Sequence, residues 1–407
     1  MATPNTLPRD ISLLRIAAQG LILATRADSA LQAVDSLLAI QGQQPSAIAH
    51  AILARSPGRK SDVVAAFNRY ELVRSWPMRG TIHVTSAADH HWLRTSLRHR
   101  YSSWIDATRR AGTTDDLVQR GADIALELIT SRGPISRSEL VNAWDANGLF
   151  SCAPQWIQAG ERPKGGQRDQ GVNPRHLIMR LHLDGVLAQG PVRAGEHLFF
   201  DASILPQPSR GVDDGVGVAR GQEGHRSALA EIARRYALGH GPIDARDLAR
   251  WTGLTLTASR DALENAAEMG QIDNEVPVVR LCVQKHGRRR LIPYKSGSSS
   301  DRILYARADW EALLSHRRSA SAPLFLGAFD ELHVGYADRT CLTDEAGEAL
   351  ICPAKNGMFR PLLIEGGRLV AVRPPTQGII AVQASPSSHL IASLERKIDQ
   401  MEQRLAS

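Results

Sequence analysis

One segment of the chain occurs twice, and this repeat constrains the fold more than any other feature of the sequence. "RGPISRSELVNAW" at residues 132–144 resembles "HGPIDARDLARWT" at residues 240–252, with Gly-Pro-Ile and a later leucine in common. A helical stretch precedes each copy, at residues 117–130 and 225–238. Because a chance match rarely repeats together with its neighbours, the repeat predicts two structural units of one kind.

The segments after each copy follow the order of a winged helix. A further helix is expected at residues 173–189 and 257–273, and the strand-like "GEHLFFD" and "VPVVRLCVQ" come next. Ser136 and Asp244 directly follow Gly-Pro-Ile and are suited to cap the next helix. The third helix of such a unit would be the recognition helix and the hairpin its wing. The copies differ by an insertion at residues 151–171, which we expect to be a surface loop.

A weaker form of this pattern is present near the N-terminus. "VRSWPMRGTIHVT" at residues 73–85 is typical of a hairpin. Helices are expected around it at residues 11–23, 30–40, 47–53, 61–69 and 87–100. The last quarter of the chain instead shows short alternating strands, in "APLFLGAFDELHVGYADRT" at residues 322–340 and around Gly366-Gly367. A final helix is expected at residues 388–405.

We therefore predict an α+β fold with three tandem winged-helix units in an arc and a C-terminal antiparallel β-subdomain. The predicted boundaries are residues 1–112, 113–212 and 213–318 for the three units, and 319–407 for the β-subdomain with its final helix. Winged helices most often bind DNA, although some serve as protein-interaction modules.

The charge of the chain suits a polyanionic partner. The formal net charge is +7 and the isoelectric point is near 9.5. A GC-rich genome, which favours Arg and Ala, would produce the same bias. The expected recognition helix of the second unit carries Arg175 and Arg180, which we expect to contact DNA. Binding through several such arginines would depend steeply on salt.

The sequence gives no sign of a membrane span, a secretion signal or a metal site. It has no run of about 18 apolar residues, and the first residues do not form a basic-then-apolar signal. Its four cysteines are scattered, without a C-x-x-C pair. We expect a reduced, cytoplasmic protein that uses neither a metal nor a cofactor.

The sequence has no convincing nucleotide-binding, metalloprotease or hydrolase motif of the common kinds, but three other stretches stand out. They are "IQGQQ" at residues 40–44, "SWPMRGTIHVTSAADHHWL" at 75–93 and "LGAFDELHVGYADRT" at 326–340. On the residues alone, the glutamines of the first stretch are most simply a helix-end cap or part of a buried amide network.

Together these stretches resemble the bacterial winged-helix DNA glycosylases of the AlkZ and YcaQ family. In that family an apolar residue precedes a Gln-x-Gln or Gln-x-Asp motif, as Ile40 precedes Gln41 and Gln43 here. The resemblance continues in order along the chain through "WPMRGTIH", "FDE" with "GYADR", and a strand pair containing Phe359, Pro361, Gly367 and Arg368. Two features depart from the family. The middle residue of the motif is Gly42 instead of an apolar residue, and Val370 to Arg373 replace a customary Gly-Thr-Trp.

The resemblance implies a monofunctional DNA glycosylase that removes alkylated purines from double-stranded DNA, with Gln41 and Gln43 as the catalytic pair. The protein would act as a monomer, and its substrates could include bulky natural-product adducts or interstrand crosslinks. Gln44 is expected to be structural or exposed to solvent. The further candidates for contact with substrate or DNA are Arg79, His83, Arg175, Arg180, Asp330, His333 and Arg339.

Other interpretations stay open for several of these residues. Asp330 could instead cap a turn or pair with Arg339, and Arg79 could fix its hairpin through an ion pair. The whole chain could also be a DNA-binding regulator without enzymatic activity, or a protein-interaction scaffold. A regulator normally needs a sensing or dimerisation domain, and the final helix is the one candidate for dimerisation, which favours the enzyme.

Amide side chains suit the removal of a base that is already activated. A purine alkylated at N7 or N3 carries a positive charge and leaves readily, so the enzyme needs to supply little acid catalysis. Two glutamines could hold a water between them by hydrogen bonds. Neither amide titrates usefully, so neither could act as a strong general base. Such a site would be limited to cationic lesions.

Overall fold

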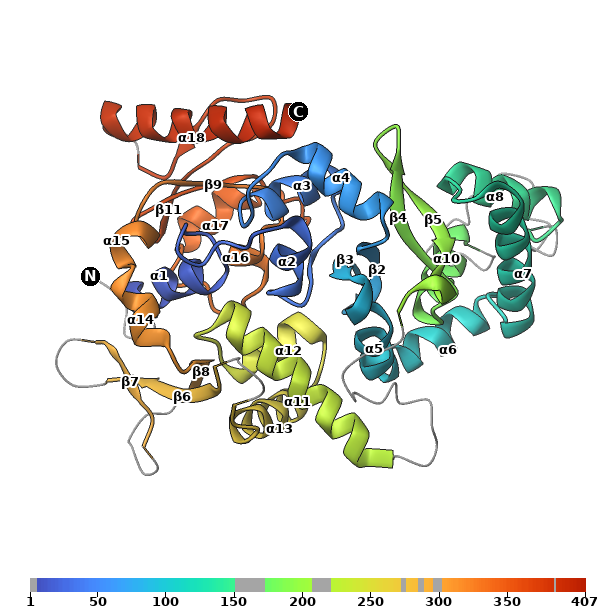
Figure 1. The fold of residues 1–407 in the computed structure, drawn as a ribbon, viewed down its shortest axis with the longest axis horizontal. Coiled ribbons are helices and arrows are strands. Elements are labelled where there is room, and N and C mark those ends of the chain that lie inside the picture. The colour runs from blue at the N-terminus through green and yellow to red at the C-terminus, as the bar shows by residue number, and fades with distance from the viewer. Residues whose placement is uncertain are drawn as a thin grey trace.

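The computed structural model describes residues 6–150, 173–206, 221–271, 276–284, 289–295, 302–383 and 386–407. It is a mixed fold of helices and antiparallel sheets, as the sequence predicts (Figure 1). The insertion at 151–171 lies outside the described residues. None of the helices that are described is both long enough and apolar enough to cross a membrane.

The N-terminal region contains most of the predicted elements. The helix α1 (Arg9–Ala18) comes first. The chain continues with α2 (Ala30–Asp35), β1 (Ile40–Gln41), α3 (Pro45–Leu53), α4 (Lys60–Asn68), β2 (Leu72–Met78), β3 (Thr81–Ser86), α5 (Ala87–Leu97) and α6 (Ser102–Arg110). Arg79 and Gly80 form the two-residue turn between β2 and β3, and both have positive φ angles, of 55° and 65°. A two-residue hairpin turn of this kind matches the twist of its strands, and Gly80 supplies the freedom it requires.

In the described residues, both copies of the sequence repeat give helices followed by antiparallel strands, and the second copy has one strand more than the first. The first copy gives α7 (Asp115–Arg132), α8 (Arg137–Ala146), α10 (Pro174–Leu183), β4 (Leu187–Arg193) and β5 (Glu196–Asp201). The second gives α11 (Gly221–His240), α12 (Ala245–Thr252), α13 (Leu256–Glu268), β6 (Val278–Val283), β7 (Leu291–Pro293) and β8 (Leu304–Arg307). Ser136 and Asp244 cap α8 and α12, each in a reciprocal capping box with the residue three positions later. Both predicted caps are therefore confirmed.

In each of three regions, one isoleucine follows a helix and pairs with the last strand of a later hairpin or sheet. Ile135 bridges to Phe199 of β5, and Ile243 bridges to Tyr305 of β8. In the N-terminal region the strand β1 places Ile40 opposite Val84 of β3. The order helix, bridging isoleucine, helix, helix and hairpin thus occurs three times along the chain.

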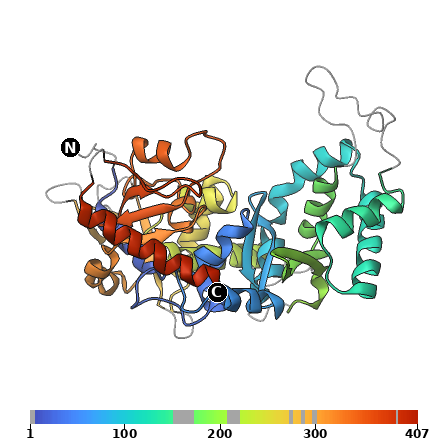
Figure 2. The same cartoon turned by 90° about the horizontal axis from the view of Figure 1, so that it is seen from above.

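Pairing between hairpins joins the first two of these regions. One five-stranded sheet has the order β1-β3-β2-β4-β5, and Arg74 of β2 pairs with Gln189 of β4. The region that carries α7, α8 and α10 therefore extends from this sheet at one end of the molecule (Figures 1 and 2). A separate three-stranded sheet has the order β7-β6-β8.

The C-terminal part adds a four-stranded antiparallel sheet of order β12-β11-β10-β9. Its elements are α14 (Trp310–Ser315), α15 (Arg317–Ala320), β9 (Leu324–Leu326), α16 (Glu331–Val334), α17 (Glu345–Ile351), β10 (Leu362–Glu365), β11 (Arg368–Val372), β12 (Ile380–Ala381) and α18 (Ser388–Ala406). The buried stripe of α18, which includes Leu394, Ile398 and Met401, packs against α3, α4 and β9. The final helix therefore joins the core, as its apolar spacing predicts.

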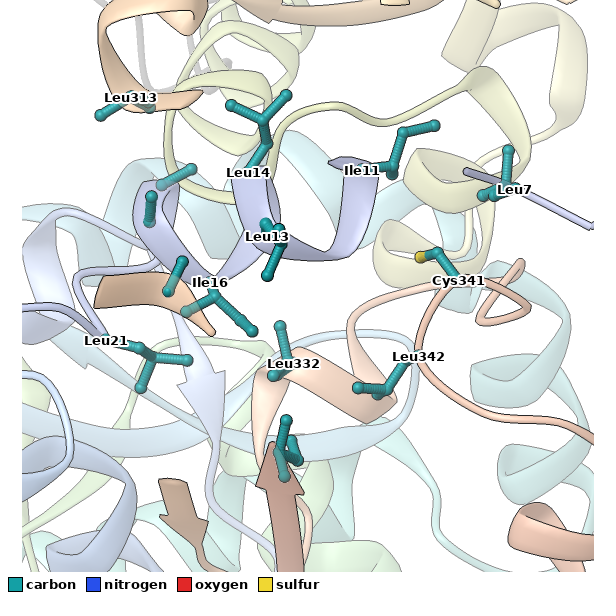
Figure 3. Close-up of a cluster of buried hydrophobic side chains, with 14 of the residues drawn as sticks. Leu7, Ile11, Leu13, Leu14, Ile16, Leu21, Leu313, Leu332, Cys341 and Leu342 are labelled. Carbon is teal, nitrogen blue, oxygen red and sulfur yellow. The ribbon is translucent and has the colours of Figure 1, made fainter. Parts of the chain in front are cut away.

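The helix α1 packs far from its neighbours in sequence. Ile11, Leu14 and Ile16 lie in an apolar cluster with Leu332 and Leu342 from the C-terminal part (Figure 3). The helix also contacts α11, α14 and α15. It thus joins the third region to the C-terminal sheet, although sequence position groups it with residues 1–112.

Several expected helices end a few residues early, and the helix expected at residues 173–189 gives way to β4 at Leu187. Two further local predictions were wrong. The helix expected at residues 30–40 ends at Asp35, because the chain turns through Leu38, with a φ of 65°, to place Ile40 in β1. Apolar residues are buried on both sides of this turn, so hydrophobic periodicity alone does not reveal it. The strands expected across 322–340 are limited to β9, since the Asp330 side chain accepts the N–H of Leu332 and starts the short helix α16.

Candidate active site

Gln41 occupies the position that a helix cap takes in the two repeat copies. It follows the bridging Ile40, as Ser136 follows Ile135 and Asp244 follows Ile243. Its helix, α3, begins four residues later, at Pro45. Extra residues therefore lie between the bridging strand and the helix, and they carry Gly42, Gln43 and Gln44.

The side chain of Gln41 holds its own turn in place. Its Oε1 accepts the backbone N–H of Gly42 at 2.9 Å and that of Gln43 at 3.3 Å. Its own N–H donates to Oε1 of Glu331 at 2.8 Å, and the residue is 7% exposed. Within the described part of the chain, no group forms a hydrogen bond with its Nε2. Gln41 is thus a rigid support with a free amide N–H₂.

Gln43 has the opposite environment. It is exposed, and its side chain lines a pocket of about 490 Å³ together with Trp76, Arg74 and Arg175. Gln44 is the N-terminal flanking residue of α3, and its Nε2 donates to the hydroxyl of Ser46 at 3.1 Å. The structure therefore separates the three glutamines into a buried one, an exposed one facing a pocket, and one bonded to its neighbour.

Gly42 lies against the strand β3. Its N–H donates to the carbonyl of Ile82 at 2.8 Å, and its carbonyl accepts Nε of Arg74 at 2.9 Å. A Cβ at this position would lie 3.1 Å from the carbonyl carbon of His83 and 3.3 Å from Cγ2 of Val84. The absence of a side chain thus lets the turn approach β3 closely.

Glu331 is the buried carboxylate behind this turn. Besides the N–H of Gln41, it accepts Nε1–H of Trp251 at 3.2 Å, and Nε2 of His240 lies 3.5 Å from its Oε2. Burial acts to raise the pKa of Glu331, but the close approach of His240 and the charge of Arg79 lower it below the ordinary value. An ionised carboxylate therefore anchors the backbone of Gln41.

His83 lies directly opposite Gln41 in the β1–β3 pairing. It is fully buried, with Nδ1 3.0 Å from the carbonyl of Thr81, and its Nε2 has no partner among the residues that the structure describes. Burial and the charge of Arg79 lower its pKa to about 4, so the ring is neutral at pH 7. Its burial leaves no surface for contact with a phosphate.

Residues 326–340, the third stretch that the sequence singled out, support the turn that carries Gln41. Asp330 is fully buried in a two-pronged ion pair with Arg55, at 2.8 Å for each oxygen, and it caps α16. Its partner is thus Arg55, not the Arg339 considered from sequence. His333 and Arg339 both contact Glu348, at 3.1 and 3.0 Å. Arg339 and Glu348 line a separate pocket with Arg246 and Asp338.

The candidate arginines differ in accessibility. Arg175 is exposed at the pocket beside Gln43. Arg79 is partly exposed, and its Nη1 donates to the carbonyl of Arg250 at the end of α12. Arg180 is 8% exposed and pairs with Asp184 and Asp115. Arg175 and Arg79 are therefore available to a ligand, whereas the guanidinium of Arg180 is held by carboxylates.

Sequence reasoning did not single out Glu331 or Arg74. Glu331 stood within "FDE", but nothing local showed that it would meet Gln41, 290 positions away. Arg74 became significant through the pairing of β2 with β4, which no local pattern predicts. Among the residues described, no group of three or more His, Cys, Asp or Glu side chains could hold a metal ion.

Comparison with known proteins identifies the family of the chain. Residues 34–407 match the family model described as "DNA glycosylase AlkZ-like". The solved structure of Streptomyces sahachiroi DNA glycosylase AlkZ has a similar fold, with a TM-score of 0.67 and 17% sequence identity over 97% of this chain and 96% of that chain. A search of curated proteins finds no match. Since the family model spans nearly the whole chain, the protein belongs to the AlkZ-like DNA glycosylases.

Proposed function

We propose that this DNA glycosylase hydrolyses the N-glycosidic bond of cationic alkylated purines, of the N7-alkylguanine or N3-alkyladenine type, in double-stranded DNA. Gln41 and Gln43 are the residues that position the attacking water. The enzyme acts as a monomer without a cofactor, and it accepts bulky natural-product adducts and interstrand crosslinks. Its role lies in DNA repair or in self-resistance to an alkylating antibiotic.

The contrast between Gln41 and Gln43 carries the proposal. Gln41 fixes the turn through its Oε1, and Glu331 fixes Gln41. Gln43 is exposed beside a pocket, where its amide can meet a ligand. A rigid backbone that presents an exposed amide is suited to orient one water against a reacting atom.

The chemistry is a hydrolysis without a strong base. The C1′–N bond breaks, and its electron pair leaves with the purine and neutralises the positive charge of the base. The water oxygen bonds to C1′, and one proton of the water passes to solvent. The amide of Gln43 accepts a hydrogen bond from this water, while Nε2 of Gln41 is a further donor at the site. Both oxygens of Glu331 already accept hydrogen bonds, so it is a positioning residue.

The three repeated regions are winged helices in this proposal. Each has a helix, a bridging isoleucine, two further helices and a hairpin, which is the order of that module. Arg79 and Arg175 contact DNA phosphates, since both reach the surface. Arg180, His83, Asp330, His333 and Arg339 support the fold around them through the contacts described above.

Exposure of Gln43 also favours bulky substrates. A site that encloses a flipped base restricts the size of the lesion. Gln43 is open to solvent, so a large adduct can remain in a groove of the duplex while the sugar meets the amide. We expect wild-type enzyme to excise a bulky N7 adduct and N7-methylguanine at rates within about 10-fold of each other, a difference of about 1.4 kcal/mol in the barrier.

The decisive experiment compares Gln43→Ala with Gln44→Ala on duplexes that contain N7-methylguanine or a bulky N7-alkylguanine. Abasic-site formation is measured under single-turnover conditions, and binding to the same duplex is measured in parallel. We expect Gln43→Ala to slow excision by about 100-fold, the effect of losing an oriented reactant, with little change in binding. Gln44→Ala is the matched control and should retain the wild-type rate.

Two outcomes would contradict the proposal in different ways. Tight DNA binding by wild-type protein without any abasic product would support a non-enzymatic DNA-binding protein that has kept the family fold. Unchanged excision by Gln43→Ala would remove that residue from the mechanism and leave the activity intact.

A further inference from the structure

The pocket beside Gln43 has a buried arginine in its floor. Strands β2, β3 and β5 contribute Arg74, Trp76, Ile82 and Phe199 to its lining, and β4 contributes Gln189. Arg74 is 7% exposed and lies at the junction between β2 and β4, opposite Gln189. The floor is therefore formed by the joined hairpins of two repeated regions.

Arg74 differs from the other buried arginines that the structure describes. Arg15, Arg55, Arg180 and Arg234 are each buried within 3.2 Å of a carboxylate oxygen. Arg74 forms no ion pair with any described residue, and burial is the cause of its lowered pKa, which is about 10. At neutral pH the guanidinium is thus charged, buried and without a counter-ion.

The hydrogen bonds of Arg74 leave one side of its guanidinium open. Nε donates to the carbonyl of Gly42 at 2.9 Å, and Nη1 donates to Oε1 of Gln189. Within the described ranges, Nη2 has no hydrogen-bond partner. A buried charge is costly unless an opposite charge compensates it. An anion in the pocket would meet this requirement.

The wall of the pocket adds positive potential. Arg137 and Arg175 are exposed there, near the first turns of α8 and α10, whose N-terminal ends carry partial positive charge. Glu196 is the opposing carboxylate, and its Oε1 accepts the N–H of Arg137 at 2.9 Å. Burial lowers the pKa of His197 to about 4, so this ring is neutral. The pocket is therefore lined by three arginines and one carboxylate, and its net charge is positive.

We propose that this pocket binds a phosphodiester of the DNA strand that carries the lesion, next to the nucleotide attacked at Gln43. This proposal depends on the proposed function only because that function places the lesion beside Gln43. A cationic alkylated purine is repelled by three arginines, whereas a phosphate is attracted and can accept a charge-assisted hydrogen bond from the open Nη2 of Arg74. Because Arg74 also holds the carbonyl of Gly42, a bound phosphate is linked through one side chain to the Gln41–Gln43 turn.

The test uses duplexes with a tetrahydrofuran abasic analogue, so that binding is measured without excision. A single neutral methylphosphonate replaces each of three linkages on either side of the analogue in turn. For wild-type protein, we expect one linkage to weaken binding by about 10-fold and to reduce the slope of log K against log salt by about 1. Arg74→Met should bind unmodified DNA about 10-fold more weakly and lose nothing further at that linkage.

Two further variants separate the phosphate contact from other effects. Arg74→Lys keeps the charge and should preserve the salt slope, although Lys lacks the bidentate geometry. Arg396→Gln removes an exposed arginine from α18 and should leave the preference among linkages unchanged. Thermal unfolding of each variant shows whether the fold is retained.

The alternatives give different results. Equal losses by wild-type protein and Arg74→Met at every linkage would overturn the proposal. A change in preference between small and bulky adducts, without coupling to any linkage, would show that the pocket receives the adduct. Coupling to one linkage with no excision of alkylated purines would leave the phosphate site standing and contradict the proposed function.

Discussion

Gln41 and Gln43 are two positions apart, yet hydrogen bonding gives them different tasks. The carbonyl oxygen of Gln41 is occupied by two backbone N–H groups, so it cannot hold a water strongly. Gln43 keeps its whole amide available at the pocket. The cap interpretation and the catalytic interpretation of "IQGQQ" are therefore compatible, because the cap at Gln41 presents Gln43.

Gly42 provides a residue-scale test of this relation. In Gly42→Ala the new Cβ meets the backbone of His83 at 3.1 Å, which forces the turn and β3 apart by a few tenths of an ångström. We expect a loss of about 1 kcal/mol in the free energy of unfolding and a drop of about 10-fold in excision, since small shifts of an oriented group are costly to rate. Chemical denaturation and single-turnover excision measure the two effects.

Gly378→Ala is the matched control for this substitution. A Cβ at Gly378 would meet no atom within 4 Å, so both stability and excision should stay at wild-type values. Faster or unchanged excision by Gly42→Ala would show that close contact with β3 is not what positions Gln43.

At the scale of elements, the sequence predicted the features that depend on local pattern, namely the repeated units and their helix caps. The Gly-Pro-Ile repeat gave matching units, and Ser136 and Asp244 are the predicted caps, because capping requires only a side chain and the next turn. The resemblance also indicated the family. The short strand β1, the joining of β2 to β4 and the contact between Glu331 and Gln41 were missed. Each depends on residues distant in sequence, which local propensity does not encode.

A buried histidine that packs against two pocket-lining aromatic rings gives a prediction about pH at this scale. His182 of α10 lies between Trp76 and Phe199, and neither ring nitrogen has a partner in the described part of the chain. Burial, with a smaller contribution from Arg74, lowers its pKa to about 3. Its unfolded value is about 6.5, so its stabilising effect is complete above pH 6.5 and is lost as the pH falls toward 3.

His182→Leu should therefore reduce the acid sensitivity of folding. The decrease in the free energy of unfolding between pH 7.5 and pH 5 should be smaller than in wild type by about 2 kcal/mol, since one proton fewer is taken up on unfolding. Urea denaturation at the two pH values measures it, and a Leu substitution at the exposed His316 is the control. An unchanged pH difference would mean that His182 is not neutral in the folded protein.

At the scale of the whole molecule, polar contacts join parts of the chain that lie far apart in sequence. Arg15 of α1 donates to the carbonyls of Pro242 and Asp338, pairs with Asp247 at 3.2 Å and lies 3.7 Å above the ring of Tyr336. The N-terminal helix, the third region and the C-terminal part thus meet at one buried guanidinium. The apolar cluster around α1 reinforces the same junction (Figure 3).

Replacement of Arg15 tests whether this junction holds the molecule together. Arg15→Met leaves the fully buried carboxylate of Asp247 without its cation, and we expect a loss of about 3–5 kcal/mol in the free energy of unfolding. In Arg15→Met/Asp247→Asn the buried charge is gone, while an amide oxygen can still accept the N–H of Ala337, so part of the loss should be recovered. Denaturant unfolding followed by tryptophan fluorescence measures both variants. If the double variant is less stable than Arg15→Met alone, the carboxylate stabilises this junction through its backbone contacts instead of its ion pair.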